Sequence, residues 1–213
     1  MKNLRDFFKS LYPANKVQQG PKPRIVILIS SRGSNMRAVL EAIHDGRLYA
    51  ECALVLADRE AAGLDVARKM GIRTELFPKG KSESREAFDA RLAERLAREQ
   101  PALIVCAGYL RIISAPLLKA FPRRIVNIHP SLLPAFPGLR AQKQALEYGV
   151  KVTGCTIHLV DAGVDTGKIL AQAVVAVQKG DTEETLSRRI LRAEHQLYWR
   201  TIGRYLKKVT SAS

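Results

Sequence analysis

The hydrophobic pattern of the chain is one of short apolar runs that alternate with longer amphipathic stretches. From residue 24 onward the apolar runs are rich in Val and Ile, as buried parallel strands are, and each amphipathic stretch stops at or near a Gly or Pro. The predicted strands cover residues 25–29, 52–57, 72–77, 103–106 and 125–129, and helices are predicted to end near residues 45, 70, 100 and 120. This alternation predicts an α/β fold with a doubly wound, Rossmann-like, mostly parallel sheet.

The last third of the sequence departs from this alternation. A helix is predicted over residues 140–148, and two strand-like segments, 153–160 and 169–177, follow it. Only the short, glycine-flanked segment 161–167 joins the two, which predicts an antiparallel pair at the edge of the sheet. The stretch from Asp181 to Glu184 has the spacing of a capping box and is expected to begin a long C-terminal helix.

The first 23 residues stand apart from the pattern. A short amphipathic helix is predicted over residues 4–12, and a linker follows it. The segment lacks the continuous apolar core of a secretory signal, and no apolar run approaches the roughly 18–20 residues that span a bilayer. We therefore expect residues 1–23 to be a basic extension outside the core, residues 24–208 to form a single domain, and the protein to be cytoplasmic without a membrane partner.

Net charge is the one unusual feature of the composition. The chain has 35 basic and 20 acidic residues, for a formal charge of +15. Such a surplus fits a nucleic-acid partner, or a solvated surface that attracts small anionic substrates. Basic residues are dispersed among acids on the predicted helices, and an aromatic content of 6% leaves few platforms for base stacking. The second interpretation is favoured, with small-molecule substrates and no nucleic acid.

Cysteine and histidine usage argues against a metal site. The three cysteines are scattered without a C-x-x-C spacing, which fits a reducing compartment better than a disulfide framework. The four histidines show no H-E-x-x-H or comparable ligand pair. No metal is predicted.

Two polar residues in the strand over 125–129 are the first candidates for chemistry. Asn127 and His129 alternate with apolar residues and so face the other side of the strand, and prolines then force a fixed loop. A histidine here is either a satisfied structural residue or part of a site. Asp165, in its glycine-flanked turn, favours the second interpretation, because a nearby carboxylate stabilises the protonated ring. An imidazolium beside an amide donor is suited to stabilise an oxyanion.

The first strand-to-helix turn is a second candidate. Gly33 allows close backbone approach, and the amides of Ser34 and Asn35 are expected at a helix N-terminus, where an anion is stabilised. The alternative is an ordinary helix cap. The turn is neither G-x-G-x-x-G nor a P-loop, so NAD and ATP are not indicated. His158, in an apolar strand, is interpreted as a core residue, and His195 as a residue on a helix face.

At this point the residues carry a family resemblance. The run Asn127-Ile-His-Pro-Ser-Leu-Leu-Pro134, followed by Asp165-Thr-Gly167, resembles the signature of the folate-dependent formyltransferases. Four further pieces are similar to the branch that acts on glycinamide ribonucleotide (GAR): Gly33-Ser-Asn35, Ser84-Arg-Glu-Ala87, Ala107-Gly-Tyr-Leu-Arg-Ile112 and Glu194-His195. The resemblance implies an enzyme of de novo purine synthesis and one-carbon metabolism. Its co-substrate is 10-formyltetrahydrofolate, whose formyl group passes to the amine of GAR.

The resemblance also implies residue roles. His129, held protonated by Asp165, is expected to stabilise the tetrahedral oxyanion, with Asn127 as a second donor. The implied GAR-binding residues are Gly33, Ser34, Asn35 and Glu194. The implied folate-binding residues are Arg85, Leu110, Arg111, Ile112, Ile113, Asn127, Asp161, Ala162, Gly163, Val164 and Asp165.

Three alternatives stay open. Methionyl-tRNA formyltransferase is expected to carry a further C-terminal domain, and formyltetrahydrofolate deformylase a regulatory domain ahead of the catalytic one. A non-catalytic nucleic-acid-binding α/β protein explains the charge but gives Asn127, His129 and Asp165 no purpose. A monomer or a homodimer is expected.

Overall fold

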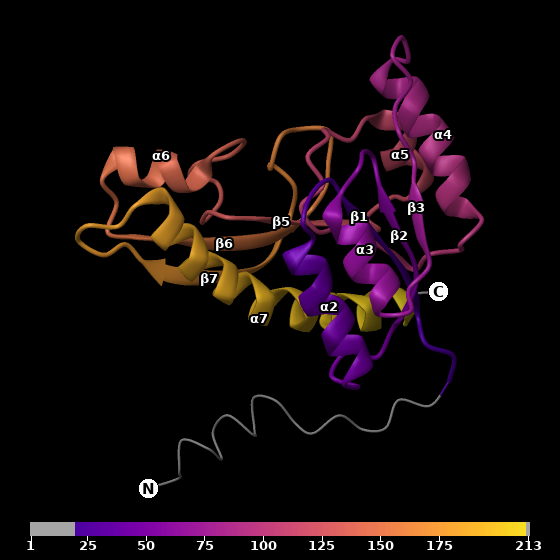
Figure 1. Ribbon diagram of the computed structural model, residues 1–213, viewed down its shortest axis with the longest axis horizontal. Helices are drawn as coiled ribbons and strands as arrows, with labels where there is room; N and C mark the ends of the chain where they lie inside the picture. Colours follow the sequence, from indigo (N-terminus) through magenta and orange to yellow (C-terminus); the bar gives the residue numbers. More distant parts are fainter. Residues whose placement is uncertain (1–19, 212–213) are drawn as a thin grey trace, which may run out of the picture.

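The computed structural model describes residues 20–211, which build one seven-stranded sheet (Figure 1). Its strands are β1 (Arg24–Ile29), β2 (Glu51–Ala57), β3 (Thr74–Leu76), β4 (Leu103–Cys106), β5 (Ile125–His129), β6 (Val152–Leu159) and β7 (Ile169–Ala176). The spatial order is β3-β2-β1-β4-β5-β6-β7, with parallel pairing from β3 to β5 and antiparallel pairing of β6 with β5 and β7. The predicted fold class is therefore confirmed.

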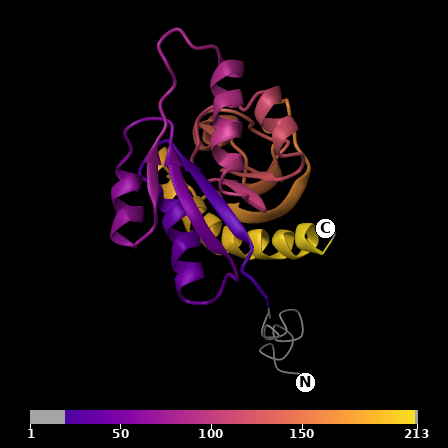
Figure 2. The same ribbon diagram turned by 90° about the vertical axis from the view of Figure 1, so that its right-hand side faces the viewer.

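Helices cover both faces of this sheet, as Figures 1 and 2 show. They are α2 (Ser34–His44), α3 (Ala62–Lys69), α4 (Arg85–Ala97), α5 (Ala115–Ala120), α6 (Ala141–Tyr148) and α7 (Glu183–Thr210). One apolar cluster joins α2, α3 and α7 to one face, and another joins α4 and α5 to the opposite face. The first turns of α7 and part of α6 pack on β6 and β7 in a third, smaller cluster.

The central strand β1 shows how the sequence produces this layering. Ile25, Ile27 and Ile29 belong to the cluster on the α7 side, whereas Val26 and Leu28 belong to the cluster on the α4 side. All five are fully buried. A strand covered on both faces has no solvent-exposed face, which explains why its sequence is a continuous apolar run.

Several element boundaries differ from the prediction. β3 is shorter than 72–77, because it lies at the sheet edge, pairs only with β2 and is only partly buried. Helix α4, capped by the Ser84 side chain, ends at Ala97 and not near residue 100. The final helix is capped by Thr182, whose hydroxyl accepts from the Thr185 backbone nitrogen (3.2 Å). The predicted helix over residues 4–12 lies outside the described residues.

Two loops meet at the point where the strand order reverses, between β1 and β4. The backbone nitrogen of Ser30 donates to Gly108 O (3.0 Å), and the backbone nitrogen of Leu110 donates to Ser30 Oγ (2.9 Å). These bonds fix the segments that follow the two strands against each other. In open α/β sheets, ligands bind in the crevice at this carboxyl-end position.

Candidate active site

A cavity of about 490 Å³ opens at the carboxyl ends of β4 and β5. Residues from five separate parts of the chain line it: the start of α2, the end of β4 with its following loop, β5 with its loop, the β6–β7 connection, and α7. Twelve of the residues that the sequence singled out line this cavity: Asn35, Leu110, Arg111, Ile112, Ile113, Asn127, His129, Asp161, Gly163, Val164, Asp165 and Glu194.

His129, the last residue of β5, is held through both ring nitrogens. Nδ1 lies 3.1 Å from Asp165 Oδ2, and Nε2 lies 2.8 Å from the backbone oxygen of Phe136. Neither a carboxylate nor a carbonyl oxygen can donate a hydrogen, so both bonds form only when both ring nitrogens carry one. The geometry is therefore that of an imidazolium, in a side chain that is buried.

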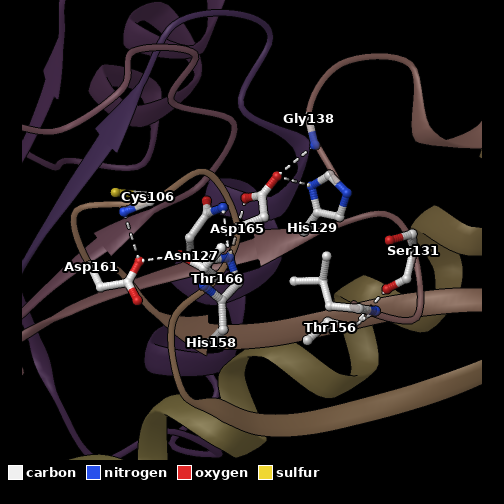
Figure 3. A network of polar contacts seen from close by, with 12 residues as sticks. Cys106, Asn127, His129, Ser131, Gly138, Thr156, His158, Asp161, Asp165 and Thr166 are labelled. Atoms are coloured by element: carbon white, nitrogen blue, oxygen red, sulfur yellow. Dashed lines mark hydrogen bonds and ion pairs between the residues drawn. The ribbon is translucent and has the colours of Figure 1, made fainter. Parts of the chain in front are cut away.

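The proline-rich loop after β5 supplies backbone groups to this arrangement. Phe136, Gly138 and Arg140 all have left-handed backbone, with φ of 56°, 77° and 56°. The loop thereby turns back on the strand end, where the Gly138 nitrogen donates to Asp165 Oδ2 (2.9 Å). Figure 3 shows the Asp165 carboxylate facing both the His129 ring and the Gly138 nitrogen.

Asp165 stays ionised in these surroundings. Burial alone would raise its pKa, but the neighbouring His158 ring, the Gly138 N–H and the His129 ring together hold that pKa below its ordinary value. The residue itself has left-handed backbone, with φ of 56°, which Asp tolerates better than most residues. A charged carboxylate therefore faces His129 Nδ1 and orients the ring.

Asn127 is oriented by a residue on the neighbouring strand. Its Nδ2 lies 3.2 Å from His158 Nε2, and His158 Nδ1 lies 2.9 Å from the Leu159 backbone oxygen. Because that oxygen only accepts, Nδ1 carries a hydrogen, and Nε2 faces the Asn127 amide. The longer 3.5 Å contact of Nε2 with Asp165 Oδ1 places all three side chains in one network (Figure 3). One Asn127 N–H remains to donate into the cavity.

The other end of the cavity is built from Asn35 and Glu194. Asn35 Nδ2 donates to Glu194 Oε2 (2.8 Å), which joins the first turn of α2 to the middle of α7. Burial raises the pKa of Glu194, only partly offset by this hydrogen bond. Asn35 Oδ1 is buried without a hydrogen-bond partner among residues 20–211, so an acceptor is left for a ligand donor.

A family model described as formyl transferase matches residues 23–202, nearly the whole of this fold. The chain belongs to the formyl transferase family. It is 42% identical over 182 residues to the phosphoribosylglycinamide formyltransferase of Mycobacterium tuberculosis (strain H37Rv), which covers 85% of this chain and 84% of that protein. It is 49% identical to a crystal structure of glycinamide ribonucleotide transformylase 1 from Symbiobacterium toebii, with a TM-score of 0.87 over 92% of this chain and 93% of the other.

A longer relative is the trifunctional purine biosynthetic protein adenosine-3 of Drosophila pseudoobscura pseudoobscura. The match is 43% identical over 203 residues, which is 94% of this chain. The chain spans only 15% of the length of that relative.

Not every residue implied by the formyl transferase resemblance lines the cavity. Ser34 is the first residue of α2, and Gly33 is its N-cap with φ of 69°, packed close to Met36 and the Gly63 backbone. Arg85 begins α4 on the surface, where its guanidinium contacts Glu86 at 3.4 Å. The fourth residue outside the lining is Ala162. Their ligand-binding roles stay predictions.

The apolar part of the formyl transferase cavity is exposed. Leu110 and Ile112, on the loop after β4, are 59% and 49% exposed, and Val164 on the β6–β7 connection is 47% exposed. Leu139 adds a fourth apolar side chain, 78% exposed. Solvated apolar side chains grouped around one cavity are typical of a binding site for a flat, partly apolar ligand.

The guanidinium of Arg111 is held by other side chains of the protein. Its side chain lies 4.4 Å from the Phe88 ring centroid and 3.8 Å from Asp58 Oδ2, and only 18% of it is exposed. Asp58 is itself paired with Arg59 at 2.8 Å. The Arg111 side chain thus anchors residues 110–112 to Phe88 and Asp58.

Sequence reasoning missed several lining residues, and His158 is the most informative. It is a buried core residue, as predicted, but it also faces the cavity beside Asn127. The register that pairs Asn127 with His158 across β5 and β6 brings them together. The other unpredicted lining residues are Cys106, Gly108, Tyr109, Ile128, Pro130, Gly138, Leu139, Arg140, Gln142 and Val160.

Residues 20–211 contain no cluster of three or more His, Cys, Asp or Glu side chains arranged to hold a metal ion. Within the same residues, no helix combines the length and hydropathy that crossing a membrane requires.

Proposed function

We propose that this chain transfers the formyl group of 10-formyltetrahydrofolate to the amine of GAR, giving formylglycinamide ribonucleotide and tetrahydrofolate. The observation that carries the proposal is the His129 ring fixed between Asp165 and the Phe136 backbone oxygen, with Asn127 beside it. A protonated imidazole and an amide N–H at one strand end form a donor pair for an oxyanion. The relatives named for GAR formylation support this choice of reaction.

The reaction needs one tetrahedral intermediate. The GAR amine attacks the formyl carbon, the carbonyl electron pair moves onto oxygen, and the bond between that carbon and folate N10 then breaks. The proton lost by the amine passes to N10, so charge and atoms balance. His129 and Asn127 stabilise the oxyanion while it exists, and such preorganised donors contribute about 2–4 kcal/mol each.

His129 Nε2 reaches the oxyanion by exchanging acceptors. In the structure its N–H is donated to Phe136 O, a neutral acceptor. The developing oxyanion is a stronger acceptor and takes that place as charge appears, while the Asp165 bond to Nδ1 holds the ring in plane. The stabilisation is therefore greatest in the transition state, which is the condition for raising kcat.

The two substrates are assigned to opposite ends of the cavity. The apolar group of Leu110, Ile112 and Val164 suits the flat pterin of the folate. The unpartnered Asn35 oxygen and the Glu194 carboxyl suit the hydroxyl and amide donors of GAR. The N-terminus of α2 beside Asn35 suits its phosphate, because backbone N–H groups there favour an anion.

The experiment that tests the proposal follows release of tetrahydrofolate in the presence and absence of GAR. Release that requires GAR supports it. Release without GAR indicates a deformylase, and release that requires methionyl-tRNA indicates a tRNA formyltransferase; either result overturns the assignment. A cytoplasmic location, and a monomer or homodimer, stay predictions.

A further inference from the structure

A second cavity, of about 210 Å³, lies between α7 and the β6–β7 pair, on the face of the sheet that α7 covers. Four cationic side chains line it: Arg123, Lys168, Arg204 and Lys208. They come from three separate segments, namely the residues before β5, the end of the β6–β7 connection, and the last turns of α7. No Asp or Glu is among its lining residues.

These four cations have no counter-charge within residues 20–211. None of them takes part in an ion pair, and the Arg204 side chain makes a single 3.5 Å hydrogen bond to Thr201 Oγ1. Arg204 and Lys208 are moreover four residues apart on one helix, a spacing at which like charges repel. Some arginines elsewhere are neutralised, as in the pairs of Arg95 with Glu75 and of Arg189 with Asp181.

The backbone that carries Arg123 is held against α7. The Tyr205 hydroxyl, on α7, donates to the backbone oxygen of Arg123 (2.8 Å), which fixes the segment before β5 against the helix. Leu159 and Leu170 supply apolar side chains to the lining. Four exposed cations and two apolar side chains around one cavity are suited to an anion, and a ligand with several charged oxygens satisfies more of the cations than a single carboxylate does.

The cavity adjoins the segment that carries Asp165. Leu159 and Lys168 stand at the two ends of that segment, and the Leu159 nitrogen donates to Lys168 O (2.9 Å). Next to Lys168, a side chain on Gly167 would overlap the Leu159 oxygen, so the two backbones are in closest contact there. His158 lines the active-site cavity and the following residue, Leu159, lines this one. The two cavities therefore lie back to back across β6.

We propose that this basic cavity binds a small anion with two or more phosphate groups, such as pyrophosphate or a nucleoside polyphosphate. Its oxygens bridge Lys168, at the base of the Asp165 segment, to Arg204 and Lys208 on α7. The site is independent of formyl transfer, and its absence would leave the proposed reaction untouched.

The test is titration of the full chain with pyrophosphate and with ATP, followed by amide chemical shifts and by calorimetry. Chemical shifts separate the two sites, since the amides of Ser34 and Asn35 lie at the helix N-terminus of the active site, and this cavity has amides of its own, those of Lys168 and Arg204. Both ligands are expected to perturb these two amides, and the binding is expected to weaken as salt rises.

The double variant Arg204→Gln/Lys208→Gln is expected to weaken this binding at least about tenfold, equivalent to about 1.4 kcal/mol. Lys151→Gln/Lys179→Gln is the matched control, because it removes two exposed charges at the opposite end of the β6–β7 pair. The proposal is wrong if the Lys168 and Arg204 amides do not respond, or if the two double variants bind alike.

Discussion

Asp165 and Glu194 are carboxyl groups that line the same cavity, yet their surroundings act on them in opposite directions. Asp165 meets a backbone N–H and two imidazole rings, and its pKa is lowered although burial opposes this. Glu194 is buried on α7 with one amide donor, from Asn35, and burial raises its pKa. The number and charge of the donors decide which effect wins.

The difference separates two tasks within one site. At the loop end, the Gly138 N–H donates to the Asp165 carboxylate, and that carboxylate in turn orients His129. Glu194 instead offers a carboxyl group that neighbouring charges do not stabilise, suited to hydrogen bonding with a neutral donor of a substrate. In the reaction that we propose, the loop end stabilises the developing charge and the helix end recognises GAR.

Removing the ring that Asp165 holds is expected to have the largest effect. His129→Ala should lower kcat by about 10²- to 10⁴-fold, because the charged donor to the oxyanion is lost. The measurement is steady-state turnover at saturating substrates, with His44→Ala as the control for an exposed histidine on α2. A His129→Ala rate within a few-fold of the unmodified protein's would remove this residue from the chemistry.

A smaller effect on kcat is expected from removing the contact between His158 and the Asn127 amide. His158→Phe removes the ring nitrogen that contacts the Asn127 amide, and kcat should fall about tenfold with little change in the KM of either substrate. His158→Gln keeps an acceptor on the side chain and should recover most of the rate. If both variants lose activity equally, His158 acts through packing and not through Asn127.

The smallest catalytic effect is expected at the helix end. Glu194→Gln keeps the shape of the side chain and removes a charge that burial disfavours, so the KM for GAR should rise less than about tenfold and kcat should change little. Initial rates at varied GAR concentration measure this. A fall in kcat as large as that of His129→Ala would show that both ends of the cavity take part in the chemistry.

Stability against pH sharpens the same comparison. Asp165, with its lowered pKa, contributes stability above its ordinary value and loses it as pH falls; Glu194, with its raised pKa, contributes stability at low pH and loses it as pH rises. Relative to the unmodified protein, Asp165→Asn should therefore lose more stability at about pH 7 than at about pH 3, whereas Glu194→Gln should be relatively more stable at about pH 7 than at about pH 3. Urea unfolding at both pH values checks the signs, and parallel trends would contradict the assignment.

Much of the fold could be predicted from the sequence, because buried parallel strands need apolar residues on both faces. β4 and β5 begin and end where the sequence predicts. The ends of the edge strand β3 differ from the prediction by one or two residues. The cap of α7 differs by one, since Asp181 and Thr182 are both good caps and only the backbone decides between them.

Part of the site could also be predicted from the sequence, because some of its groups are side chains in a motif. Asn127, His129 and Asp165 are side chains in a recognisable motif, and they meet as expected. The groups that hold these side chains belong to the backbone. Phe136 contributes a backbone carbonyl and Gly138 a backbone N–H, so the residue types do not indicate these contacts. The contact of His158 with Asn127 could be predicted only from the register between β5 and β6, because the two residues are 31 positions apart in the chain.

The most direct test of the account is the rate of formyl transfer by Asp165→Asn at saturating 10-formyltetrahydrofolate and GAR. The variant keeps the shape of the side chain but removes the negative charge that faces His129 Nδ1. We expect kcat to fall about a hundredfold or more while both substrates still bind, because an uncharged partner leaves the ring without its proton or its orientation. A kcat close to that of the unmodified protein would contradict the central role of the Asp165–His129 pair.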